Sequence, residues 1–270
     1  TMRAGILVLG PLLARYGNAK VSTPGGCSIG VRPIDMHLKA LSKLGVKHKI
    51  RDGYVYSHSS KKLKGTKIKF NKISVGATEN LIIAAAMAEG ETLLSNCAIE
   101  PEIKDLVNFL NKLGCKIEWI GKRIVKIIGV KNLSKINYNI MFDRIEAGTY
   151  LIAAALTEGH LKISKVKPKI ISTEINILKK IGAKIKLKSN SIFIKGSKKI
   201  KRTNIKTAPY PGFPTDLQAQ MMVLLCKGNS KSTIREKIFE NRFMHVSELN
   251  RMGANIRIKE NKAFVEGTIK

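Results

Sequence analysis

Cysteine is scarce in this chain, and its four cysteines form no recognisable metal or disulfide pattern. They are scattered over 270 residues without a C-x-x-C pair or a histidine at ligand spacing. Zinc sites and disulfide-rich secreted domains both depend on such spacings. The pattern therefore argues against a metal site and predicts a reducing, cytoplasmic location. The cysteines are Cys27, Cys97, Cys115 and Cys226.

Long apolar runs are also missing. A membrane-spanning helix needs about 20 predominantly apolar residues, and no stretch of the sequence approaches that length. The apolar segment at residues 4–14 is interrupted by Pro11 and is not followed by a small-x-small cleavage site. We therefore expect a soluble protein with neither a signal peptide nor a membrane partner.

Acidic residues are few, because 19 Asp and Glu face 49 Lys and Arg, which gives a formal charge of +30. Such a balance often indicates nucleic-acid binding. Here 38 of the basic residues are lysines spread along the whole chain, and no RNA-recognition signature accompanies them. This pattern favours a solvated surface, and a basic nucleic-acid binder is kept as the weaker alternative. The 44% hydrophobic content is enough for a core and predicts two domains.

The sequence repeats itself about every seventy residues. Four segments end in a Leu-rich helix signal followed by glycine, and these glycines are separated by 69, 68 and 71 residues. A second set of glycines follows Ala- or Leu-rich segments at intervals of 69 residues. Fixed periods of this size indicate a repeated supersecondary unit. The two sets are Gly45, Gly114, Gly182 and Gly253, and Gly90, Gly159 and Gly228.

Each repeat is predicted to form helix, strand, helix and two short strands. An apolar helix ends at a glycine suited to a left-handed cap, and an amphipathic helix follows the first strand. The chain enters the first repeat directly at its first helix and stops where a further strand would open. The expected elements of the last three repeats are 78–88, 91–95, 101–113, 116–119 and 124–128; 145–157, 161–164, 170–181 and strands near 185 and 192–194; and 214–226, 230–235, 243–252, 255–258 and 263–265.

The loop at residues 24–33, with the sequence PGGCSIGVRP, combines three glycines with a cysteine and an arginine. Glycines allow a backbone to approach a ligand closely. Arg32 offers a donor fork for a phosphate and would favour the thiolate of Cys27. By residue type alone, Cys27 is either a packed thiol or an acid acting beside a phosphate, and both interpretations stay open.

Four separated motifs and the repeat resemble the UDP-N-acetylglucosamine enolpyruvyl transferases, from residue 1 to residue 270. The motifs are PGGCSIGVRP at 24–33, KISVGAT at 72–78, PTDLQAQ at 214–220 and FENRFMHV at 239–246. The resemblance implies an α/β fold of the inside-out α/β barrel type, made of two domains with three such repeats each. It places residues 1–140 in one domain and 141–270 in the other, and both would be incomplete. The sibling shikimate-pathway enzyme shares the fold but is not expected to carry the cysteine loop.

The resemblance implies a transferase of peptidoglycan synthesis, and hence of cell wall biogenesis, cell shape, the cell cycle and cell division. The enolpyruvyl group of phosphoenolpyruvate would move to the 3-hydroxyl of UDP-N-acetylglucosamine, with release of phosphate. It implies small-molecule substrates, no cofactor and no metal, no nucleic acid or membrane partner, and a monomer when complete. Missing segments would include a Lys-Asn pair and further arginines that face the phosphate.

The family's functional residues carry over motif by motif. Cys27 would donate the proton to phosphoenolpyruvate and form a pyruvate adduct, and Asp216 would be the base for the sugar hydroxyl. Asp143, Arg144 and Arg242 match positions near the cleft, with surface ion pairs as the alternative. The substrate-binding positions are Arg3, Arg32, Pro33, Ile34, Asp35, Met36, Lys72, Ile73, Ser74, Val75, Asp216 and Ile238.

Three hypotheses follow from the sequence. The chain is an enolpyruvyl transferase, an inactive truncated remnant of one, or a basic nucleic-acid binder. UDP-N-acetylglucosamine-dependent phosphate release separates the first two, and salt-sensitive binding of random oligonucleotides identifies the third. Truncation, a decayed gene and an excerpt of a longer chain are equally compatible with the residues.

Overall fold

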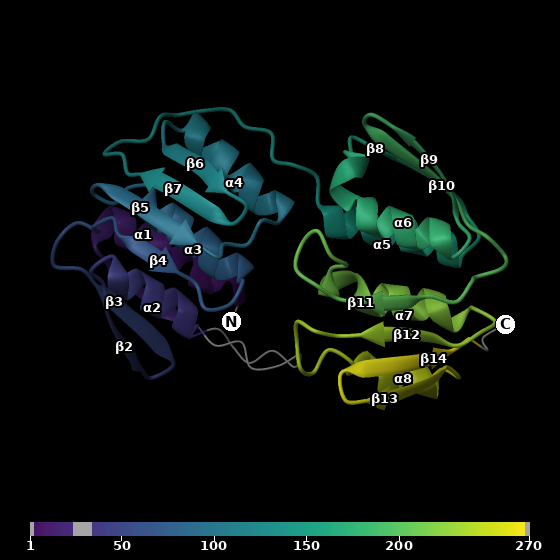
Figure 1. The fold of residues 1–270 in the computed structure, drawn as a ribbon. Helices are drawn as coiled ribbons and strands as arrows, with labels where there is room; N and C mark the ends of the chain where they lie inside the picture. Colours follow the sequence, from purple (N-terminus) through teal and green to yellow (C-terminus); the bar gives the residue numbers. More distant parts are fainter. Residues whose placement is uncertain (1–2, 24–33, 268–270) are drawn as a thin grey trace. The chain divides into compact units, whose positions relative to one another are not determined.

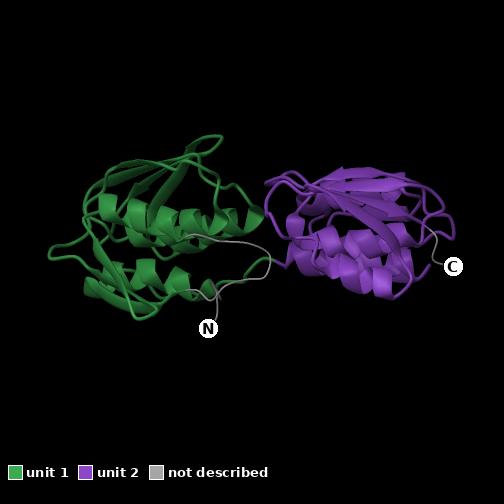
Figure 2. Ribbon diagram, turned by 90° about the horizontal axis from the view of Figure 1, so that it is seen from below, with its two compact units in different colours: residues 1–27, 31–141 green, residues 28–30, 142–270 purple. Residues whose placement is uncertain are grey.

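A computed structural model of the chain describes residues 3–23 and 34–267. The chain divides into two compact units (Figure 2), with described residues up to Met141 in unit 1 and those from Phe142 onward in unit 2. The predicted site residues Cys27, Arg32 and Pro33 lie outside the described residues. That the units are the two family domains predicted at 1–140 and 141–270 stays a prediction.

The four-fold repeat predicted from the glycines is confirmed by its backbone geometry. At the end of the second helix of each repeat, a glycine adopts a positive φ between 94° and 118°. The N–H of each glycine donates to the carbonyl three residues earlier at 3.0–3.1 Å. A side chain at this φ would be strained, so the glycines are required for the turn. They are Gly45, Gly114, Gly182 and Gly253.

Unit 1 contains the first two repeats (Figure 1). Its helical elements are η1 (Arg3–Val8), α1 (Leu9–Tyr16), α2 (Asp35–Lys43), α3 (Val75–Ala85) and α4 (Pro101–Lys112). Its strands are β1 (Asn18–Ser22), β2 (Lys47–Arg51), β3 (Tyr54–His58), β4 (Lys67–Lys69), β5 (Glu91–Ser95), β6 (Lys116–Gly121) and β7 (Ile124–Ile128). They form two sheets in the orders β1-β3-β2 and β4-β5-β7-β6.

Unit 2 repeats the same arrangement. Its helical elements are α5 (Arg144–Leu156), η2 (Pro168–Ile171), α6 (Ser172–Lys180), η3 (Thr215–Leu217), α7 (Gln218–Cys226) and α8 (His245–Arg251). Its strands are β8 (His160–Ser164), β9 (Lys184–Lys188), β10 (Ser191–Lys195), β11 (Asn204–Lys206), β12 (Ser232–Arg235), β13 (Asn255–Lys259) and β14 (Lys262–Glu266). The sheet orders are β8-β10-β9 and β11-β12-β14-β13.

Each sheet packs one face against the helices of its own repeat, and alternation along the strands sets which residues are buried. In β3, Val55 is buried while the flanking Tyr54 and Tyr56 are exposed. In β10, Ile192 and Ile194 are buried on the helix side. Because successive strand residues face opposite sides of a sheet, this alternation gives each unit one contiguous core.

In each unit, one short strand connects the two repeats. β4 pairs in parallel with β5, and β11 pairs in parallel with β12. Both strands precede the first helix of the repeat whose sheet they join. All other strand pairs in the four sheets are antiparallel, so each parallel strand extends the sheet of the following repeat.

Candidate active site

In unit 1, four helical segments meet at one buried side chain, that of Asn80. Asn80, on α3, accepts a hydrogen bond from the N–H of Gly10 at 2.7 Å. Its amide donates to the carbonyl of Ile6 at 3.0 Å and lies 3.0 Å from Nδ1 of His37 on α2. A Cβ at Gly10 would collide with oxygens of Asn80, so only glycine permits this approach of α1 to α3. Asn80 therefore joins η1, α1, α2 and α3.

This junction brings together two of the predicted nucleotide-sugar segments. His37 belongs to the first turn of α2, next to residues 34–36, and a Cβ on Gly76 of α3 would lie 3.4 Å from its ring. Residues 72–75 lead into α3 beside it. Arg3 opens η1, which reaches the same junction through Ile6.

The individual residues of these segments have different surroundings. Ser74 caps α3, because its hydroxyl oxygen accepts from the N–H of Ala77 at 3.3 Å, and a helix N-terminus of this kind favours an anion. Lys72 is exposed, and Asp35 pairs with Lys39 at 3.3 Å. The apolar members are partly buried against the core of unit 1: they are Ile34, Met36, Ile73 and Val75.

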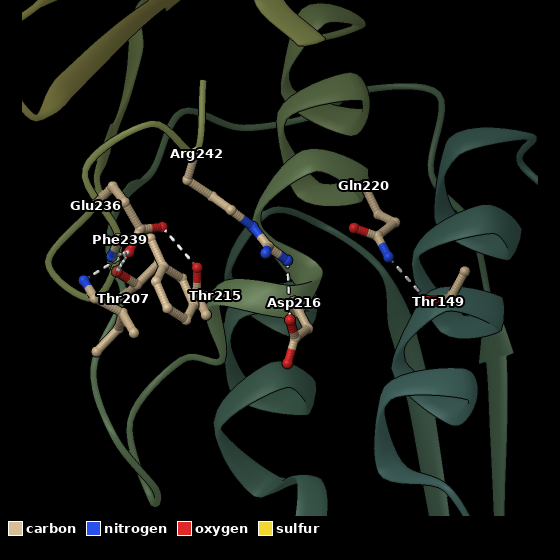
Figure 3. Close-up of polar contacts among 9 residues, drawn as sticks. Thr149, Thr207, Thr215, Asp216, Gln220, Glu236, Phe239 and Arg242 are labelled. Atoms are coloured by element: carbon tan, nitrogen blue, oxygen red, sulfur yellow. Dashed lines mark hydrogen bonds and ion pairs between the residues drawn. The ribbon is translucent and has the colours of Figure 1, made fainter. Parts of the chain in front are cut away.

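In unit 2, Asp216 lies in η3 and forms an ion pair with Arg242 (Figure 3). Nη2 of Arg242 donates to Oδ1 of Asp216 at 2.8 Å, and 54% of the Asp216 side chain is exposed. Burial, together with the charge of Arg242, lowers the pKa of His245. The positive charge paired with Asp216 is that of Arg242. More than half of the Asp216 side chain stays accessible from solvent.

Asp143 and Arg144 both act locally at the start of α5. Asp143 caps the helix by accepting from the N–H groups of Ile145 and Glu146 at 2.7 and 3.1 Å. Arg144 is buried, and its guanidinium lies 5.8 Å from the ring centre of Tyr210. Burial raises the pKa of Glu174 on α6, and the charge of Arg144 partly opposes that rise. These contacts are structural, and a role near a substrate stays a prediction.

Sequence reasoning missed two residues that organise these segments, Asn80 and Glu236. Asn80 carried a usable signal, because a polar residue interrupts the apolar helix at 75–85. Glu236 carried none, because its partners Thr207 and Thr215 lie 29 and 21 residues away in the sequence. Ile238 is 37% exposed next to it.

Residues 3–23 and 34–267 show neither a metal-binding cluster nor a membrane-spanning helix. No group of three or more His, Cys, Asp or Glu side chains in these residues is arranged to hold a metal ion. No helix in the same part of the chain has the length and apolar character needed to cross a membrane.

Three of the four cysteines are expected to be inert in the folded chain. Cys97, Cys115 and Cys226 are buried, and burial raises the pKa of each thiol, that of Cys97 to about 12. Because the thiolate is the nucleophile, iodoacetamide at pH 7.5 should leave all three unmodified. Mass spectrometry of folded Cys27→Ser should show no label, and the same variant in urea should take up three. Labelling of any of the three in the folded variant would contradict this assignment.

Solved structures define the class of fold. The enolpyruvyl transferase NikO from Streptomyces tendae superposes with a TM-score of 0.84 at 21% identity, over 96% of this chain and 62% of that one. An EPSP synthase from Acinetobacter baumannii gives a TM-score of 0.67 at 20% identity, over 99% and 64% of the two chains. The chain thus has the enolpyruvyl transferase fold, and the predicted inside-out α/β fold is confirmed.

The chain belongs to the EPSP synthase (3-phosphoshikimate 1-carboxyvinyltransferase) family, whose model matches residues 1–270. It is 72% identical over 270 residues to a UDP-N-acetylglucosamine 1-carboxyvinyltransferase of Pelagibacter ubique (strain HTCC1062). It is 52% identical to a protein of the same name from Geotalea uraniireducens (strain Rf4). Both alignments take in 100% of this chain but only 65% and 64% of the relatives. The predicted resemblance is confirmed, and the chain spans about two thirds of these relatives' length.

Proposed function

We propose that the chain serves the transfer of the enolpyruvyl group from phosphoenolpyruvate to the 3-hydroxyl of UDP-N-acetylglucosamine. The main support for this proposal is the 72% identity over all 270 residues with a protein named for that reaction. Cys27, in the motif PGGCSIGVRP at 24–33, supports the same choice over the shikimate-pathway sibling. The product would enter peptidoglycan synthesis as its first committed precursor.

Cys27 and Asp216 would move the protons of this reaction. The thiol of Cys27 gives its proton to the methylene carbon of phosphoenolpyruvate, which becomes a methyl group. Asp216 takes the proton of the sugar hydroxyl as its oxygen bonds to the neighbouring carbon. Phosphate then leaves and one methyl proton returns to the thiolate of Cys27, which restores the carbon–carbon double bond. A positioned acid or base contributes about 10²- to 10⁴-fold in rate.

The anionic groups would be held by cations and by the start of α3. Arg32 would face the phosphate of phosphoenolpyruvate, and Arg3 and Lys72 the diphosphate of the nucleotide. Ser74 and the free N–H groups of the first turn of α3 would add hydrogen bonds to the same diphosphate. The remaining nucleotide-sugar contacts would come from residues 34–36 and Ile238.

The broader setting follows from this reaction. We propose a cytoplasmic enzyme that acts as a monomer on small molecules, in a pathway that supports cell shape and cell division. The two units would be the two partial family domains. Nucleic acid and membranes are not proposed as partners.

The test is phosphate release from phosphoenolpyruvate by the 270-residue chain. Release is expected when UDP-N-acetylglucosamine is present and not when phosphoenolpyruvate is supplied alone. UDP-glucose, which lacks the acetamido group, serves as the matched control and should support less release than UDP-N-acetylglucosamine. Phosphate release that does not depend on the nucleotide sugar contradicts the proposed activity of this chain, and no release at all favours the inactive remnant.

A further inference from the structure

The buried carboxylate of Glu236 is bonded to the segment that carries Asp216. Glu236 directly follows β12 and is 2% exposed. Its Oε1 accepts hydrogen bonds from the hydroxyl of Thr207 at 2.7 Å and from the N–H groups of Ile238 and Phe239 at 2.7 and 3.3 Å. Its Oε2 accepts from the hydroxyl of Thr215 at 2.8 Å. A carboxylate is costly to bury without partners, and these four donors offset that cost.

The four bonds tie three separate chain segments to one side chain (Figure 3). Thr207 follows β11, Thr215 opens η3, and Ile238 and Phe239 form the loop after β12. The hydroxyl of Thr207 also accepts from the N–H of Lys237 at 2.8 Å, which adds a second link to that loop. Glu236 therefore holds Thr215, which is next to Asp216, and it holds Ile238 through the backbone N–H of that residue.

Arg242 links the two segments that Glu236 holds, because it contacts both Asp216 and Phe239. Its guanidinium donates to Asp216 at 2.8 Å and lies 5.6 Å from the ring centre of Phe239. Phe239 is bonded to Glu236 through its N–H, and Asp216 is joined to Glu236 through Thr215. The two carboxylates thus have separate tasks: Glu236 is buried and saturated with donors, whereas Asp216 is 54% exposed.

We propose that Glu236 is a positioning residue that presents Asp216 and Ile238 to the nucleotide sugar as one rigid surface. The identity of the ligand rests on the proposed function, whereas the positioning rests on the hydrogen bonds alone. A carboxylate suits this place because one of its oxygens accepts three donors while the other accepts a fourth. Preorganised contacts bind a ligand more tightly, since less ordering is left to occur on binding.

Thr215→Val tests the link between Glu236 and Asp216, because it removes one hydroxyl and keeps the side-chain shape. Thr233→Val is the matched control: it removes a hydroxyl of β12 that donates to Asn204 at 2.7 Å, away from the site. Amide hydrogen exchange at Leu217, Ile238 and Phe239 should quicken about tenfold in Thr215→Val and stay unchanged in the control, since one hydrogen bond corresponds to about that factor. Unchanged exchange at these amides would overturn the positioning role, whether or not a nucleotide sugar binds.

Calorimetry with UDP-N-acetylglucosamine then tests the consequence for the ligand. Thr215→Val should weaken binding about tenfold relative to the control, while both variants keep the melting temperature of the folded chain within a few degrees. Glu236→Gln should bind UDP-N-acetylglucosamine with nearly the affinity of the original chain. Its amide oxygen can still accept from three donors, and its NH₂ group can donate to the hydroxyl oxygen of Thr215. Wild-type affinity in Thr215→Val, with exchange quickened, would overturn the role in ligand binding. Absence of binding by the unmodified chain would instead contradict the proposed function, and the exchange result would still decide the positioning role.

Discussion

Replacement of Asp216 by asparagine should slow UDP-N-acetylglucosamine-dependent phosphate release by about 10²- to 10⁴-fold, because an amide cannot accept the hydroxyl proton. The fold should be untouched. The Asp216 side chain is 54% exposed, and the asparagine oxygen can still accept the hydrogen bond from Arg242. The measurement is the steady-state rate with both substrates saturating, together with the melting temperature.

Asp52→Asn is the matched control for this change. Asp52 is also an exposed aspartate paired with an arginine at 2.8 Å, since Nε of Arg51 donates to its carboxylate in the turn between β2 and β3. Its replacement should leave the rate within about twofold of the original, because exposed pairs contribute little. Equal rates in the Asp216 variant and the control would remove Asp216 from the role of base.

Replacement of Asn80 by alanine should destabilise unit 1 by about 3 kcal/mol, because it strips partners from buried backbone groups that cost about 1–3 kcal/mol each when unsatisfied. The N–H of Gly10 and the carbonyl of Ile6 both bond to the Asn80 side chain. The single tryptophan of the chain, Trp119, lies in β6 of unit 1. Its fluorescence during urea unfolding therefore reports on this unit, and the midpoint should fall by about 1–2 M.

Asn18→Ala provides the comparison within the same unit. Asn18 is exposed on β1, where its side-chain oxygen lies 2.6 Å from Nδ1 of His58. Surface changes of this kind usually shift stability by less than about 0.5 kcal/mol. A midpoint for Asn80→Ala no lower than that of Asn18→Ala would show that the junction of η1, α1, α2 and α3 does not depend on Asn80.

The repeat was predictable because its signals are local. A glycine after a leucine-rich helix marks a left-handed turn, and the same turn recurs in all four repeats. Helix starts were less certain from sequence. The helix predicted from residue 78 begins at Val75, because Ser74 caps it, and the helix predicted from residue 214 begins as the 3₁₀ turn η3.

The candidate site was predictable only where a motif carried it. PTDLQAQ and KISVGAT pointed to Asp216 and to residues 72–75, whose local settings the structure describes. The hydrogen bonds that hold the segment of Asp216 in place could not be predicted from the sequence. Glu236, Thr207 and Thr215 come from three segments that only tertiary folding brings together, and nothing in the sequence distinguishes Glu236 from a surface glutamate.

The parallel strands β4 and β11 bear on how cooperatively the protein unfolds. The segment before β4 is bonded to the preceding repeat, because the N–H of Lys64 donates to the carbonyl of Leu44. The strand β4 itself pairs with β5 of the following repeat. In unit 2, the N–H of Lys201 donates to the carbonyl of Ile181 in the preceding repeat, and β11 pairs with β12 of the following repeat. One repeat therefore cannot open without exposing an edge of its neighbour's sheet, which couples the two repeats energetically. Residues 129–143 contain no strand, so this strand-mediated coupling operates inside each unit. We therefore expect the two repeats of a unit to melt together.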